Sequence, residues 1–236
     1  MSSLDAAEKF NSARASEYQA QSRIALAGYD ACHELAACVL AAVVGSGTAA
    51  HILVLGAGGG AQEIVAAGKL EPAWRFTAVD PSRPMMDIAV ARLEEHGLAE
   101  RTEIHLGYVD NLPDVRRFGA ATLIGVLHHL PGTEAKRHIL HAIAARLLPG
   151  APLILAGNRY AYADHPTLLA AWGERWRMQG STPEEVKAKL GKILQGADPP
   201  ASEEALAVLL SEAGFGRPTW FFSSLFWGAC IARLEA

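Results

Sequence analysis

A cluster of glycines follows a short apolar run in the segment HILVLGAGGGAQEI, residues 51–64. The apolar run Ile52–Leu55 predicts a buried parallel strand, and a helix is expected over about residues 61–69. Glycines suit this junction because the chain must turn sharply and a ligand can then lie close to the backbone. The pattern Gly56-x-Gly58-x-x-Ala61 fits the fingerprint of dinucleotide-binding turns. We therefore expect Gly56, Ala57, Gly58 and Gly60 to contact a bound ligand.

Acidic residues follow the next two predicted strands, which cover about residues 75–80 and 102–107. A carboxylate at Asp80 can accept hydrogen bonds from both hydroxyls of a ribose, although it could instead cap the following helix. Asp110 is placed to accept a hydrogen bond from an adenine amino group. Together these residues predict a nucleoside site, to which we also assign Pro81, Met85 and Asn111.

Two adjacent histidines are expected at the end of a fourth strand, Ala121–Leu127. Side chains alternate along a strand, so only one of His128 and His129 should face the site. His128 is the candidate for lining the pocket or acting as a general base. No third ligand is in view, so we predict no metal site.

The remaining pattern alternates helices with strands and predicts a Rossmann-like α/β fold. We expect a seven-stranded, mostly parallel sheet with helices on both faces. Further helices are expected over residues 84–97, 134–148, 164–195 and 202–213. Residues 218–234 predict a C-terminal antiparallel hairpin that turns near Ser223–Ser224. We divide the chain into an N-terminal helical cap, residues 1–47, broken at Gly28, and a domain over residues 48–236 with a helical lid at about 160–200.

Composition sets limits on the class of protein. The 236 residues carry a formal net charge of −4, which argues against a general polyanion binder. The three cysteines form no ligand-like pair and are expected to be reduced and buried. The apolar stretch Leu35–Val44 is shorter than the roughly 20 residues that span a bilayer. We expect a cytoplasmic protein without a membrane anchor.

These motifs together resemble the class I S-adenosylmethionine-dependent methyltransferases. The resemblance rests on VLGAGGG (54–60), AVDPS (78–82), GYVDNLP (107–113), TLIGVLHHLPG (122–132) and LLPGAPLIL (147–155). It implies S-adenosyl-L-methionine as the cofactor and methyl transfer as the reaction. It also implies that the N-terminal helices cover the cofactor, with Tyr29 and Arg23 near its methionine end.

A closer likeness is to the carboxy-S-adenosylmethionine synthase branch of that fold. It rests on residues 23–44 and on the tail from Glu212 to Gly228. That branch uses an arginine to hold the extra carboxylate, and the corresponding position falls near Lys187 or Ala188. An asparagine typical of the branch is also replaced near Gly125. These departures favour plain methyl transfer.

Other functions stay open at this point. The glycine turn alone does not separate S-adenosylmethionine from a nicotinamide cofactor, so an NAD-dependent oxidoreductase is one alternative. A non-catalytic nucleoside-binding protein is another. A small-molecule acceptor is the first expectation, with tRNA or protein acceptors and a homodimer left open. Trp172 and Trp176 lie where a substrate lid is expected and could form an aromatic wall.

Overall fold

A seven-stranded sheet forms the centre of the molecule in the computed structural model, which describes residues 20–115 and 117–235. The strand order is β3-β2-β1-β4-β5-β7-β6. Five strands are parallel: β1 (His51–Leu55), β2 (Arg75–Asp80), β3 (Thr102–Leu106), β4 (Ala120–Ile124) and β5 (Pro152–Asn158). The hairpin strands β6 (Thr219–Ser224) and β7 (Trp227–Arg233) are antiparallel, and β7 pairs with β5. The predicted fold class is confirmed.

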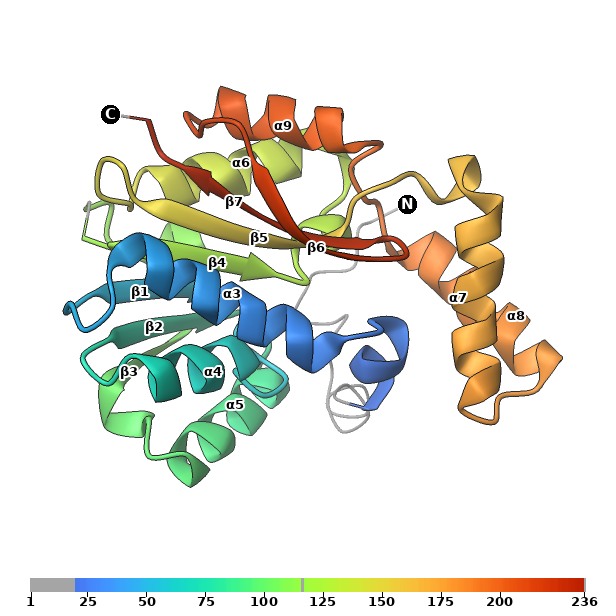
Figure 1. Cartoon of the computed structure of the whole chain (residues 1–236), viewed down its shortest axis with the longest axis horizontal. Coiled ribbons are helices and arrows are strands. Elements are labelled where there is room, and N and C mark those ends of the chain that lie inside the picture. Colours follow the sequence, from blue (N-terminus) through green and yellow to red (C-terminus); the bar gives the residue numbers. More distant parts are fainter. Residues whose placement is uncertain (1–19, 116, 236) are drawn as a thin grey trace.

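Helices cover both faces of this sheet (Figure 1). One face carries α3 (Tyr29–Val44), α4 (Gln62–Leu70) and α5 (Arg83–Glu95), and the other carries α6 (Gly132–Ala144) and α9 (Glu203–Glu212). Side chains alternate along each strand, so a buried strand contributes to the buried clusters on both faces of the sheet. In β1, Ile52 and Val54 belong to one buried cluster while Leu53 and Leu55 belong to the other.

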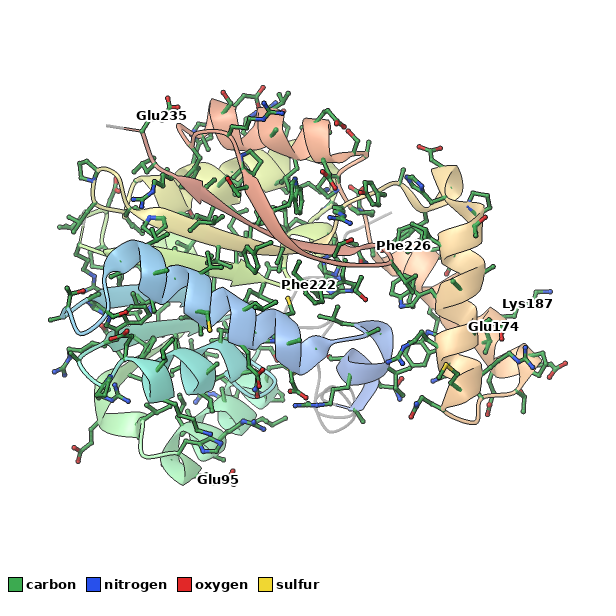
Figure 2. All side chains as sticks on the ribbon, in the orientation of Figure 1. Glu95, Glu174, Lys187, Phe222, Phe226 and Glu235 are labelled. Atoms are coloured by element: carbon green, nitrogen blue, oxygen red, sulfur yellow. The ribbon has the colours of Figure 1, made fainter. Side chains whose placement is uncertain are left out.

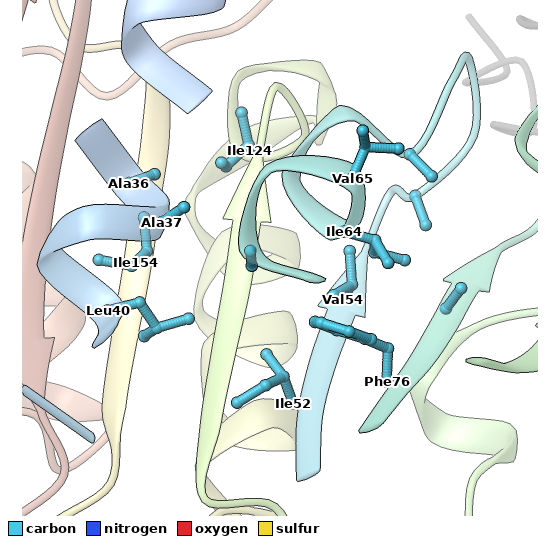
Figure 3. Close-up of a cluster of buried hydrophobic side chains, with 14 of the residues drawn as sticks. Ala36, Ala37, Leu40, Ile52, Val54, Ile64, Val65, Phe76, Ile124 and Ile154 are labelled. Carbon is cyan, nitrogen blue, oxygen red and sulfur yellow. The ribbon is translucent and has the colours of Figure 1, made fainter. Parts of the chain in front are cut away.

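Helix α3 is built into the first of these clusters. Figure 3 shows Ala36, Ala37 and Leu40 of α3 in the same cluster as strand and α4 side chains. The helix begins after Gly28, whose φ of 85° is left-handed, so the predicted break at this glycine is confirmed. Residues 20–25 before it are also helical, and the part of the expected cap before residue 20 lies outside the described residues. The domain boundary at residue 47 stays a prediction.

Two helices, α7 (Pro166–Met178) and α8 (Pro183–Gly196), stand at one end of the sheet (Figure 1). The expected helical stretch over 164–195 is therefore two helices with a break after Met178. The chain restarts at Thr182, whose side chain and that of Glu185 form a capping box, with Pro183 in the first turn. These local capping interactions favour a new helix over continuation.

Other boundaries differ from expectation for equally local reasons. Strand β4 ends at Ile124, not Leu127, because Gly125 has a φ of 76° and the chain leaves the extended conformation. Short 3-10 segments cover Ala99–Arg101, Val109–Asn111, Leu127–His129 and Tyr162–Asp164. Helix α6 spans Gly132–Ala144. The hairpin turns at Leu225 and Phe226, after the expected serines.

Two further observations concern the described residues as a whole. Within residues 20–115 and 117–235, every helix is too short or too polar to cross a membrane. All three cysteines are free, and Cys38 is exposed, which corrects the expectation that all would be buried.

Candidate active site

A cavity of about 410 Å³ opens where the parallel strands β1, β4 and β5 end. Ligands of open α/β sheets bind at this edge, where the strand order reverses between β1 and β4. The glycine turn, the N-terminal helical segment, the chain after β4 and the helices α7 and α8 all contribute walls. The lining residues that matter below are Tyr29, His33, Gly56, Gly58, Glu63, His128, His129, Asn158, Trp172, Trp176, Lys189, Lys192 and Trp227.

The glycine turn is held to strand β2 by backbone hydrogen bonds. The N–H groups of Gly56 and Ala57 donate to the carbonyl of Val79, at 2.8 and 3.2 Å. A Cβ on Gly56 would lie 2.3 Å from the side chain of Val126, and its φ is 71°. A Cβ on Gly58 would lie 2.5 Å from that of Met85. Close packing of protein atoms therefore requires both glycines, in addition to any approach of a ligand.

Asp80 holds this turn against the end of β2. Its carboxylate accepts hydrogen bonds from the N–H of Gly58 at 3.0 Å and from the N–H of Ser82 at 2.8 Å. Burial raises the pKa of Asp80, and these two bonds act against that rise. The helix-cap alternative is wrong, because the hydroxyl of Ser82 accepts from the Met85 N–H and caps α5. The ribose role of Asp80 stays a prediction.

The other nucleoside-site residues lie beside the cavity and not in its wall. Ala57 and Gly60 are buried within the turn, and Pro81 lies between the end of β2 and Ser82, the N-cap of α5. Asp110 is exposed and its oxygens lie 3.1 Å from Nε2 of His138. The side chain of Asn111 accepts a hydrogen bond from the Tyr108 N–H, which closes its 3-10 turn. Their roles toward adenine stay predictions.

The two N-terminal candidates occupy different places. Tyr29 lines the cavity, whereas Arg23 lies outside its lining. Arg23 forms an ion pair with Asp30 at 2.7 Å, and its guanidinium lies 4.6 Å from the centre of the Tyr29 ring. Arg23 thus packs on the ring of Tyr29, a residue of the cavity wall, without lining the cavity itself.

Both histidines of the HH pair line the cavity, which corrects the expectation that only one would. They lie in the 3-10 segment Leu127–His129, so the alternation of a strand does not apply. Nδ1 of His128 accepts a hydrogen bond from the Asn158 N–H at 3.4 Å. This network assigns the proton of a neutral His128 to Nε2, which makes that atom a donor. His128 is thus part of the cavity lining, and its role as a general base stays a prediction.

Sequence reasoning missed two buried ionisable residues in the wall. Glu63, in the first turn of α4, and His33, in α3, both line the cavity, with 3.9 Å between Oε2 of Glu63 and Nε2 of His33. Their spacing in the sequence gives no indication of this pairing, because the two helices meet only in the folded chain.

Helices α7 and α8 supply tryptophans and lysines to the cavity. Lys187, near which the arginine position of the synthase branch falls, is exposed and points away from the body of the protein (Figure 2), outside the cavity lining. Lys189 and Lys192 line the cavity instead. Nζ of Lys189 lies 4.8 Å from the centre of the Trp176 ring, a cation–π contact.

Ala61 adopts a left-handed conformation at the end of the glycine turn, with φ 45° and ψ 39°. Left-handed backbone costs a non-glycine residue roughly 1–2 kcal/mol. We expect Ala61→Gly to raise the free energy of unfolding by up to about 1 kcal/mol, because glycine's own entropic cost offsets part of the relief. Urea denaturation measures this. Ala66→Gly inside α4 is the matched control and should lower stability by about 1 kcal/mol. An equal fall in the free energy of unfolding in both variants would show that the backbone of Ala61 is not strained.

Comparisons with known proteins agree with this architecture. Residues 52–150 match a family model described as a methyltransferase domain. No curated protein matches the sequence. The fold resembles a Nostoc punctiforme protein assigned as an O-methyltransferase, with a TM-score of 0.68, 14% identity and coverage of 93% of this chain and 59% of that one.

Two further solved structures have a similar fold. The pyocyanin biosynthetic protein PhzM has a TM-score of 0.66 at 12% identity, covering 98% of this chain and 62% of its own. The mitomycin 7-O-methyltransferase MmcR has a TM-score of 0.59 at 24% identity, covering 85% and 53%. The chain thus spans less than two thirds of each of these proteins. The likeness shows a Rossmann-like methyltransferase fold.

Proposed function

We propose that this chain is an S-adenosylmethionine-dependent methyltransferase. The observation that carries the proposal is the cavity at the carboxyl ends of β1, β4 and β5, bordered by the glycine turn. The matched methyltransferase domain contains this turn and the end of β4. The position of the cavity, the glycine turn and the matched methyltransferase domain thus support the same class of enzyme.

The residues present fit a nucleoside with an amino-acid end. A cavity of about 410 Å³ lies within the range of roughly 300–1,000 Å³ that holds small ligands. Buried polar atoms are normally paired. Among the described residues, Oδ1 of Asn158 and Nε1 of Trp176 are buried without a hydrogen-bond partner, and both residues line the cavity. A polar ligand would satisfy such atoms.

In this proposal the two ends of the cofactor lie on different parts of the site. The amino-acid end would occupy the cavity beside the glycine turn, and the ribose and adenine would extend toward Asp80 and Asp110. Asp80 has both oxygens in use, at Gly58 and Ser82, yet each carboxylate oxygen can accept a second hydrogen bond. A role toward ribose hydroxyls is therefore compatible with its structural bonds.

The cofactor supplies an activated methyl group when bound. The chain's own contribution is to hold the acceptor atom in line with that group, and orientation of this kind can be worth about 7–11 kcal/mol. Trp172, Trp176 and Trp227 form an aromatic part of the wall that can position a flat or apolar acceptor. A general base is needed only where the acceptor arrives protonated.

We propose a small molecule as the acceptor, because the cavity is of small-ligand size and aromatic-walled. The similar structures include the mitomycin 7-O-methyltransferase, and another was solved with apigenin bound. Transfer of a labelled methyl group into the small-molecule fraction of an extract is the expected result. Label in tRNA or protein instead would overturn the small-molecule proposal.

Competition for the site separates the cofactor alternatives. Native mass spectrometry of the purified protein is run with S-adenosylmethionine, its carboxylated relative and NAD at equal concentration. We expect the adduct of ordinary S-adenosylmethionine. The extra carboxylate of the carboxylated form is bound most strongly by an arginine, whose guanidinium group donates two parallel hydrogen bonds to it. The described residues that line the cavity include no arginine. A dominant carboxylated adduct would favour the synthase branch, and a dominant NAD adduct would favour an oxidoreductase.

A further inference from the structure

The cavity contains one buried carboxylate among its described lining residues, that of Glu63. Its residue is 8% exposed, and its ion-pair neighbour His33 is 3% exposed. His33 is fixed by a 2.8 Å contact between its Nδ1 and the backbone carbonyl of Tyr29, so Nδ1 carries the proton that makes this bond. Nε2 therefore faces Glu63 at 3.9 Å, which is beyond hydrogen-bond distance.

Burial favours the uncharged form of both partners, so it shifts their pKa values in opposite directions. It raises the pKa of Glu63 to about 7, the nearby carboxylate of Asp80 adds to that rise, and a hydrogen bond from Glu63's own backbone N–H opposes it. Burial also lowers the pKa of His33, against the effect of its bond to Tyr29. Both shifts favour the uncharged forms. When Glu63 ionises, a neutral His33 at 3.9 Å therefore gives its buried carboxylate no full counter-charge.

A cationic ligand group in the cavity would supply that counter-charge. Buried charges are stable only when paired, and an ammonium group offers three donors to a carboxylate. Glu63 lies in the first turn of α4, directly after the glycine turn, where the proposed function puts the cofactor's amino-acid end. We propose that Glu63 binds the α-ammonium group of that amino-acid end. The inference rests on the proposed function.

Other titratable groups near Glu63 come from three directions. Helix α3 contributes His33 and Cys32, and the pKa of the Cys32 thiol is raised to about 12, so it stays protonated near neutrality. Strand β2 contributes Asp80, which repels a second negative charge. His128, His129, Lys189 and Lys192 also line the cavity. Binding of an ammonium group should still follow the ionisation of Glu63, because that group gains the new partner.

The test compares two ligands that differ only beyond the adenosine sulfur. S-adenosylhomocysteine carries the amino-acid end, and 5′-methylthioadenosine lacks it. Glu63→Gln keeps the shape and removes the charge. We expect it to weaken binding of S-adenosylhomocysteine by about tenfold or more, as for loss of a charge-assisted hydrogen bond. Binding of 5′-methylthioadenosine should not change. Glu95→Gln, an exposed glutamate on α5 (Figure 2), is the matched control and should change neither affinity.

The pH dependence of the wild-type protein gives a second readout that needs no variant. Affinity for S-adenosylhomocysteine should rise as the pH rises through about 7, because ionised Glu63 attracts the ammonium group and protonated Glu63 does not. Affinity for 5′-methylthioadenosine should show no such rise. Two outcomes would overturn the inference: the same pH dependence of affinity for the two ligands, or an equal loss of affinity for both ligands in Glu63→Gln. If the wild type binds neither ligand, the proposed function itself fails.

Discussion

Replacing Asp80 with alanine should lower the affinity for S-adenosylhomocysteine by about tenfold to more than a hundredfold. The change removes a carboxylate that accepts hydrogen bonds from Gly58 and Ser82 and, in our proposal, from the ribose. Hydrogen bonds to charged groups contribute about 1.5–3 kcal/mol each, which corresponds to that range of affinity. Isothermal titration calorimetry measures the loss directly.

The choice of ligand separates this effect from that of Glu63. Because 5′-methylthioadenosine keeps the ribose, Asp80→Ala should lower the affinity for both ligands. Glu63→Gln should lower only the affinity for S-adenosylhomocysteine, which carries the amino-acid end. Asp87→Ala, an exposed aspartate on α5, is the control. A folded Asp80→Ala variant that binds S-adenosylhomocysteine as tightly as wild type would show that the ribose role is wrong.

Trp172→Ala should have the largest effect on stability. Trp172 is 2% exposed and packs with Tyr162 and Phe226 in a cluster that joins the lid to the hairpin. Its ring centre lies 5.5 Å from that of Phe226, and its Nε1 donates to the Ala25 carbonyl at 2.7 Å. Removing a buried aromatic ring costs about 3–5 kcal/mol. The free energy of unfolding in urea should fall by that amount.

Two controls define the source of this loss. Trp172→Phe keeps a ring and loses the hydrogen bond to Ala25, so its cost should be smaller than that of alanine. Met178→Ala changes a side chain of α7 that is 74% exposed and should leave stability unchanged. If Trp172→Ala matches the stability of Met178→Ala, the cluster does not hold the lid in place.

The fold was largely predictable because its elements carry local patterns. Buried strands such as β1 and β5 are apolar runs. Gly56 follows the last residue of β1, and Pro152 is the first residue of β5. The antiparallel hairpin follows from a link too short for a crossover. Errors arose where backbone conformation at one residue decided a boundary, as at Gly125 for β4 and at Thr182 for α8.

The site was predictable only in part. Gly56, Gly58, Tyr29 and His128 line the cavity. The turn and the helix start follow from sequence patterns, whereas His128 lies in a 3-10 segment beyond the end of β4 and not at the predicted strand end. Contacts of these residues with a cofactor stay predictions. Glu63 and His33 were missed because their pairing depends on how α3 packs against α4. Lys187 and Ala188, near which the resemblance places the arginine of the synthase branch, lie outside the cavity lining, whereas Lys189 and Lys192 belong to it.

Calorimetric titration of the purified wild-type protein with S-adenosylhomocysteine and, separately, with NAD tests the central claim most directly. We predict saturable binding of S-adenosylhomocysteine and no tight binding of NAD, because the cavity is proposed to hold an amino-acid end beside the glycine turn. Tight binding of NAD without binding of S-adenosylhomocysteine would contradict the assignment as a methyltransferase.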